Sequence, residues 1–185
     1  SVTKLWGREE GVGGFYRNDQ LTAAVNEEIL EQGDRVTVFT YKDLENWSDR
    51  YAYFTENKLT VQAGTEFTLT LKCYQNNEYW ELENVAVSGA PIGVFGSSGD
   101  YSVPDYIKGG EILPGMGIYY PNATTDNEGV VNMSVSQPGT YFITAQHDFS
   151  GYTNPTTGNP DYLVPPICTV TVLSEDEYAA YEKTQ

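Results

Sequence analysis

The sequence predicts an all-β protein, an antiparallel β-sandwich with an N-terminal extension of mixed short elements. Three observations predict this fold class. Apolar and polar residues alternate with a period of two, the period of a strand, through much of the chain. The alternating segments are rich in Val, Ile, Thr, Tyr and Phe, which favour strands. Gly, Pro, Asn and Asp bound these segments, as turn residues do.

Six segments show the alternation most clearly. They are residues 35–41 (RVTVFTY), 59–61, 66–73 (EFTLTLKC), 130–134, 140–146 (TYFITAQ) and 168–173 (CTVTVL). Strands of a sandwich turn alternate side chains toward the space between the sheets. The core positions expected on the two longest segments are Phe67, Leu69, Leu71, Cys73, Tyr141, Ile143 and Ala145.

Turn and helix signals complete the pattern. Residues 126–129 (DNEG) predict a tight turn, because Asp and Asn bond their own backbone and Gly accepts a positive φ. Residues 21–31 (LTAAVNEEILE) predict one or two helical turns that stop at Gly33. Ser174 is a good N-cap for residues 174–183, where acidic residues favour the helix N-terminus. That tail is expected to be a short helix or the start of a linker.

Charge excludes several classes of partner. The 185 residues contain 26 Asp and Glu against 10 Lys and Arg, a formal net charge of -16. No basic surplus is available to replace the counterions of nucleic acid, so we expect no nucleic-acid partner. Anionic membrane surfaces are disfavoured for the same reason. No run of about 18 apolar residues occurs, so we expect no insertion into a membrane.

The Gly and Pro positions divide the chain into three parts. Residues 1–54 are an N-terminal segment, either a small accessory domain or an extension that packs on the sandwich. Residues 55–174 hold the main strand series, and residues 175–185 are a tail or linker. The chain begins at Ser1 without an initiator Met or an apolar signal segment, so we expect a mature or excised piece of a longer protein.

Three stretches carry a family resemblance. They are residues 86–94 (AVSGAPIGV), 125–134 (TDNEGVVNMS) and 138–145 (PGTYFITA), and residues 164–172 (VPPICTVTV) resemble the closing strand. Together they resemble the bacterial immunoglobulin-like repeats of cell-surface and adhesin proteins, over about residues 55–174. The resemblance implies an immunoglobulin-like sandwich in an extracellular protein of the cell surface or cell wall. Residues 21–54 more weakly resemble the segment that precedes such domains.

The residues for catalysis are sparse, so we expect the protein not to be an enzyme. His147 is the sole histidine and the only candidate base for a hydroxyl or thiol nucleophile. No G-x-S-x-G nucleophile motif occurs. One histidine and no second cysteine pair also argue against a zinc site. No cofactor is expected.

Calcium is the better candidate metal, because acidic extracellular modules offer it carboxylate and carbonyl oxygens. The loop acids that could bind it weakly are Asp100, Asp105, Asp148 and Asp161. The more conservative interpretation is that these acids are solvated and keep the protein soluble. Cys73 and Cys168 form either one disulfide or two buried thiols.

Two long connections, residues 96–122 and 147–166, interrupt the strand series. Loops beyond about 12–15 residues are usually functional or mobile. Their candidate ligand-binding residues are Tyr101, Tyr106, Tyr119, Tyr120, Phe149, Tyr152 and Tyr162. Tyr offers an apolar face and a hydroxyl, which suits stacking on sugars or docking a protein. The alternative is that these rings cover a small core under their own loops.

The expected function is therefore that of a non-enzymatic adhesion or spacer unit, with a protein or glycan at the cell surface as partner. Two alternatives remain open. One is a carbohydrate-binding module that uses the loop tyrosines. The other is an accessory domain of a secreted enzyme.

Overall fold

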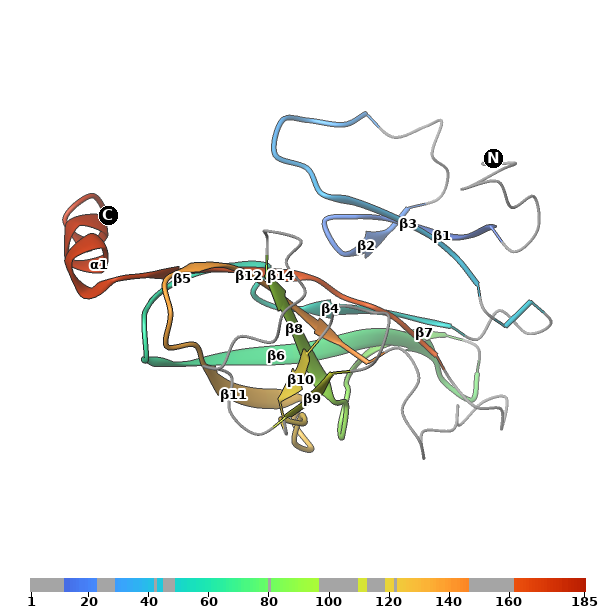
Figure 1. The fold of residues 1–185 in the computed structure, drawn as a ribbon. Helices are drawn as coiled ribbons and strands as arrows, with labels where there is room; N and C mark the ends of the chain where they lie inside the picture. Colours follow the sequence, from blue (N-terminus) through green and yellow to red (C-terminus); the bar gives the residue numbers. More distant parts are fainter. Residues whose placement is uncertain are drawn as a thin grey trace.

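The computed structural model describes residues 12–22, 29–41, 43–44, 49–79, 81–96, 110–112, 119–121, 123–146 and 162–185. These residues form an all-β sandwich of two main sheets, with a small third sheet against one of them and a single described helix (Figure 1). The predicted fold class is confirmed.

The first main sheet has six strands. Their order is β5 (Lys58–Gln62), β14 (Cys168–Leu173), β12 (Gly139–Ala145), β8 (Ile92–Gly96), β10 (Tyr119–Pro121) and β9 (Gly110–Ile112). β12 runs antiparallel to both β14 and β8, whereas β5 runs parallel to β14 over five residue pairs, from Lys58 beside Thr169 to Gln62 beside Leu173. In chain order, β5 is the first strand of this sheet and β14 the last, and the two lie side by side.

The second main sheet is built around the long strand β6 (Glu66–Asn76). Its order is β11 (Val130–Ser134), β6, β4 (Arg50–Phe54) and β13 (Leu163–Val164), and β7 (Leu82–Ala86) also pairs with β6. β11 pairs with residues 66–70 of β6 and β7 with residues 72–76, so these two strands follow one another along the same side. β4 lies on the other side. The sandwich thus begins before the predicted boundary at residue 55.

Alternate residues of these strands fill the core between the two sheets. All seven predicted core positions are buried, and Leu69, Leu71, Cys73 and Ile143 are 0% exposed. They pack with residues of the neighbouring strands, namely Ala52, Phe54, Ile92, Val94, Val131, Met133, Cys168, Val170 and Val172. Burial of each large apolar side chain contributes about 1.5–3 kcal/mol before conformational entropy is counted.

The turn predicted at residues 126–129 forms and packs tightly. One carboxylate oxygen of Asp126 accepts hydrogen bonds from the backbone N–H groups of Glu128 (3.0 Å) and Val130 (2.8 Å). Gly129 has a φ of 77°, and a Cβ there would lie 2.4 Å from the carbonyl oxygen of Leu71. Only glycine satisfies both conditions, so this turn places β11 closely against β6.

The third sheet is formed by the N-terminal segment. Its order is β2 (Gln20–Leu21), β1 (Val12–Arg17) and β3 (Val36–Thr40). Asn18 and Asp19 connect β1 to β2 with positive φ angles of 50° and 62°, the conformation that two-residue hairpins require. The hairpin makes Leu21 a strand residue beside Tyr16, so the helix predicted from Leu21 is wrong at its start. Residues 29–31 are not helical, and residues 23–28 lie outside the described residues.

The tail forms helix α1 (Glu175–Glu182), which confirms the short helix expected for these residues. Ser174 caps the helix: its hydroxyl accepts from the N–H of Glu177, and the Glu177 carboxylate accepts from the N–H of Ser174. These bonds lower the pKa of Glu177. No residue of α1 is buried. The helix projects from the end of β14, away from the third sheet (Figure 1).

Candidate functional site: a cleft between the third sheet and the sandwich

Aromatic rings join the third sheet to the outer face of the second main sheet. Tyr16 of β1 stacks on Tyr51 of β4, with ring centroids 3.7 Å apart and planes 8° from parallel. Phe39 of β3 and Val164 of β13 complete the buried cluster, and Tyr53 and Tyr74 are among the partly buried rings around it. The cluster exists because Tyr51 and Tyr53 point outward from β4, while Ala52 and Phe54 point into the main core.

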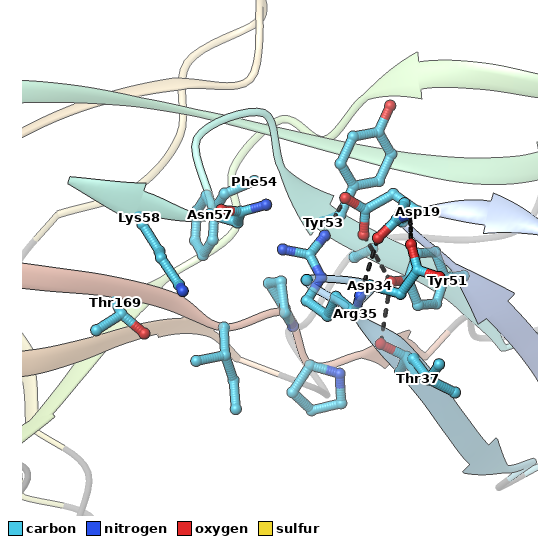
Figure 2. A pocket seen from close by; sticks show the side chains of 17 residues that line it. Asp19, Asp34, Arg35, Thr37, Tyr51, Tyr53, Phe54, Asn57, Lys58 and Thr169 are labelled. Atoms are coloured by element: carbon cyan, nitrogen blue, oxygen red, sulfur yellow. Dashed lines mark hydrogen bonds and ion pairs between the residues drawn. The ribbon is translucent and has the colours of Figure 1, made fainter. Parts of the chain in front are cut away.

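A cleft of ≈ 680 Å³ opens beside this cluster, between the third sheet and the edge of the sandwich (Figure 2). Residues from three distant parts of the sequence form it. They are Asn18, Asp19, Gly33, Asp34, Arg35, Val36, Thr37, Tyr51, Ala52, Tyr53, Phe54, Asn57, Lys58, Pro165, Pro166, Ile167 and Thr169. A volume of this size is typical of small-molecule sites.

A hydrogen-bonded network organises the wall that the third sheet contributes. Asp19 accepts a hydrogen bond of 2.7 Å from the hydroxyl of Tyr51 and forms an ion pair with Arg35. The Tyr51 hydroxyl also lies 3.3 Å from the hydroxyl of Thr37. Burial, followed by the Asp19 contact, raises the pKa of Tyr51 above its ordinary value, so this hydroxyl keeps its proton and donates it.

Asp34 stabilises the loop that carries Arg35. Its carboxylate accepts from the backbone N–H of Glu31 (2.7 Å), the side-chain amide of Asn18 (2.7 Å) and the guanidinium of Arg17 (2.8 Å). The bonds from Glu31 and Asn18, together with the weaker effect of Arg17, hold the pKa of Asp34 below its ordinary value. Asp34 is therefore charged and hydrogen-bonded through both carboxylate oxygens. These bonds fix the loop and with it the position of the next residue, Arg35.

The opposite wall comes from the start of β5 and from the chain around β14. It presents Asn57, Lys58 and Thr169, with Pro165 and Ile167 along the rim. The carbonyl oxygen of Asn57 accepts from the backbone N–H of Thr169 at 2.9 Å, which fixes the start of the parallel β5–β14 pairing. Figure 2 shows Lys58 and Thr169 on one side of the cleft and the Asp19–Tyr51–Thr37 network on the other, with Arg35 between them.

The structure leaves most of the predicted ligand-binding aromatics untested. Tyr101, Tyr106, Phe149 and Tyr152 lie outside the described residues. Tyr119 and Tyr120 form the short strand β10, of which the backbone is described and the side chains are not. Tyr162 is half-buried before β13, and its carbonyl oxygen accepts from the N–H of Arg50 at 2.8 Å. Tyr162, the one of the seven whose side chain is described, is not among the described residues that line the cleft.

The predicted calcium ligands, Asp100, Asp105, Asp148 and Asp161, also lie outside the described residues, as does His147. Within the described part of the chain, no group of three or more His, Cys, Asp or Glu side chains is arranged to hold a metal ion. The calcium site stays a prediction.

The disulfide alternative is corrected, because Cys73 and Cys168 are buried thiols that form no disulfide. Cys73 lies on β6 and Cys168 on β14, in different sheets, and both side chains belong to the main core. The sulfur of Cys73 accepts a hydrogen bond of 3.2 Å from the buried guanidinium of Arg50. Burial raises the pKa of Cys168 to about 12, so its thiol is protonated at neutral pH.

The sequence alone did not indicate the cleft. Its charged residues, Asp19, Asp34, Arg35 and Lys58, lie in three separate segments that show no motif. One local signal was present: Arg-Asn-Asp-Gln at residues 17–20 is the composition of a tight hairpin.

Comparisons with known proteins add no assignment. No protein-family model matches the chain, and no curated protein matches it significantly. Among the helices that the structure describes, none is long and apolar enough to cross a membrane.

Proposed function

We propose that this chain is a non-enzymatic, immunoglobulin-like module of a bacterial cell-surface protein, a spacer that bears tension between its neighbours. The parallel pairing of β5 with β14 is the observation that carries this proposal. Extracellular localisation and an adhesive partner on the cell surface belong to the same proposal.

The strand order supports an immunoglobulin-like arrangement. The constant type places strands A, B and E in one sheet and strands C, F and G in the other. Here β4, β6 and β11 are neighbours in the second sheet, and β8, β12 and β14 are neighbours in the first. Taken in chain order, these six strands match A, B, C, E, F and G.

A tyrosine at the start of β12 supports the same arrangement. The hydroxyl of Tyr141 donates a hydrogen bond of 3.1 Å to the carbonyl oxygen of Gln137, four residues upstream. Many immunoglobulin-like domains have such a tyrosine corner near the start of strand F. Tyr141 is also buried in the core, so it joins the turn to the packed interior.

The parallel pairs determine how the fold resists a pull on its ends. β5 comes early and β14 late in the chain, and they run in the same direction over five residue pairs. A force that pulls the two chain ends apart therefore drives these strands past each other along their length, which loads all their hydrogen bonds at once. β4 and β13 are also parallel, so the same force shears a second contact.

Single-molecule force spectroscopy tests this role. Pulled from its two ends, the chain should unfold at high force, because the hydrogen bonds of the parallel β5–β14 pair are loaded together. The measured force reports the unfolding rate of the structure under that load. The matched control pulls the same protein between Gln137→Cys and its C-terminal end. That geometry unzips the antiparallel β12–β14 pair, whose partners include Gly139 and Val172, so the unfolding force should be clearly lower. Equal forces in the two geometries would refute a load-bearing role.

A further inference from the structure

The cleft holds nitrogen donors that the described residues of the protein do not use. Among the described residues, the side chains of Asn57 and Lys58 have neither a hydrogen bond nor an ion pair within the chain. Arg35 engages one terminal nitrogen with Asp19, and its other guanidinium donors have no partner in the described part of the chain. These three side chains approach the same space from opposite walls (Figure 2).

The local charge at this cleft differs from that of the whole protein. Arg35 offsets the charge of Asp19, and Arg17 offsets that of Asp34. The charged residues that line the cleft balance, with Asp19 and Asp34 against Arg35 and Lys58, in a chain whose formal net charge is -16. Since salt screens exposed charges beyond about 8 Å under physiological conditions, the nearby residues dominate the field that a bound ligand experiences. Both acids already accept hydrogen bonds from protein groups, whereas the Lys58 ammonium has no such partner among the described residues, so the cleft offers its unengaged donors to a ligand with one negative group.

The other lining groups indicate the rest of the ligand. Thr37, Thr169 and Asn57 offer hydroxyl and amide groups, which bind the hydroxyls of a polar ligand. The partly exposed ring of Tyr53 and the rim residues Pro165 and Ile167 offer apolar surface for C–H groups. A sugar combines many hydroxyls with small apolar faces, and the volume of ≈ 680 Å³ accommodates one or two sugar rings.

We infer that this cleft binds a carboxylate-bearing sugar. The carboxylate lies between Arg35 and Lys58, and the sugar hydroxyls face Asn57 and Thr169. A planar guanidinium matches a carboxylate with two parallel hydrogen bonds, and a lysine adds a compact point charge. The site shares Lys58 and Thr169 with the β5–β14 contact. Ligand binding would use their side chains, whereas the tension-bearing contact uses backbone hydrogen bonds, so a binding assay and a pulling experiment test the two proposals separately.

Titration calorimetry of the purified chain with sodium glucuronate, glucose and sodium acetate tests the inference. Glucuronate should bind. Glucose lacks the carboxylate and its charge-assisted hydrogen bonds, and acetate lacks the ring and its hydroxyl contacts, so each should bind about tenfold more weakly or worse. Galacturonate oligomers extend the measurement to longer ligands. Failure of every acidic sugar to bind at about 10 mM, a concentration that reveals even weak binding, would overturn the inference. Acetate that binds as tightly as glucuronate would also overturn it.

Matched variants localise the site. Lys58→Met should weaken glucuronate binding by about tenfold or more. Lys183→Met changes the net charge equally but lies beyond helix α1, so it should leave binding unchanged. Arg35→Lys retains the charge and loses the planar fork, so it should weaken glucuronate more than glucose. Circular dichroism confirms that each variant is folded. Equal losses in Lys58→Met and Lys183→Met would show a nonspecific charge effect and overturn the assignment.

Discussion

One hydroxyl group closes the corner through which the chain enters β12. Tyr141→Phe removes the hydrogen bond to the Gln137 carbonyl and retains the buried ring. We expect the free energy of unfolding to fall by about 1 kcal/mol, the usual net contribution of one such bond. Urea unfolding measures this as a lower midpoint with an unchanged m-value. Tyr178→Phe, in the exposed helix α1, is the control, and an equal effect of the two variants would contradict a structural corner.

The buried thiol of Cys168 makes the free energy of unfolding depend on pH in the alkaline range. Its pKa rises from 9.0 to about 12 on folding, mainly through burial. The folded protein therefore binds more protons than the unfolded chain above pH 9, so the free energy of unfolding falls as the pH rises from about 9 to 12. Burial raises the pKa of Tyr16 and Tyr51 in the same direction.

Urea unfolding between pH 8 and pH 11 measures this decline. Cys168→Ala should lower stability at pH 8, because a buried group is lost, and should also make the decline above pH 9 shallower. A free energy of unfolding that stays constant across this pH range would show that the thiol titrates normally. Below pH 9, the native thiol should also react slowly with thiol reagents until the protein unfolds.

At the scale of elements, the Tyr16–Tyr51 stack connects the third sheet to the sandwich. Tyr16→Ala should destabilise this contact by about 3–5 kcal/mol, as truncation of a large buried ring does. We expect a local effect: amide hydrogen exchange should increase in β1, β2 and β3, and stay slow in β12 and β14. Tyr79→Ala removes a ring that is 74% exposed and should change neither. Loss of protection in β14 as well would mean that the third sheet is part of one cooperative unit.

The strands that could be predicted from the sequence are those with one buried face. β6, β11 and β14 alternate buried positions with half-buried or exposed ones through most of their length, as β12 does up to Ile143, and their predicted ends agree with the structure within a few residues. Among the strands that were not predicted, β4 and β8 have both of their faces covered. In β4, the core covers Ala52 and the third sheet covers Tyr51. In β8, Ile92, Gly93 and Val94 are all buried, so no period of two is visible.

The cleft could not be predicted for a different reason. Its walls meet only through long-range contacts: the hairpin at Asn18–Asp19, the loop at Asp34–Arg35 and the strand start at Asn57–Lys58. The Asp34–Asn18 bond spans 16 residues, and the Tyr51–Asp19 bond spans 32. The local sequence pattern identifies strands and turns. The three cleft segments come together only because the aromatic cluster packs the third sheet against the sandwich.

At the scale of the whole molecule, the acidic surface opposes the packing that holds the chain compact. The acidic side chains that produce the formal net charge of -16 repel one another, and this repulsion destabilises the compact state. Ion pairs oppose this repulsion, and two of them in the described part of the chain are Arg17–Asp34 and Arg35–Asp19. Salt weakens both the repulsion and the pairs, so the sign of its effect shows which of them dominates.

We expect repulsion to dominate, because 26 acidic side chains face only 10 basic ones. The Debye length falls from about 30 Å at 0.01 M to about 8 Å at 0.15 M salt, which removes most long-range repulsion but little of a partly buried pair. Raising NaCl over this range at pH 7 should therefore raise Tm, and a gain of about 1 kcal/mol would correspond to about 2–4 °C. Near the isoelectric point, pI ≈ 4.2, the same salt step should have little effect. A Tm that falls with salt at pH 7 would instead show that the ion pairs beside the cleft contribute more than the acidic surface opposes.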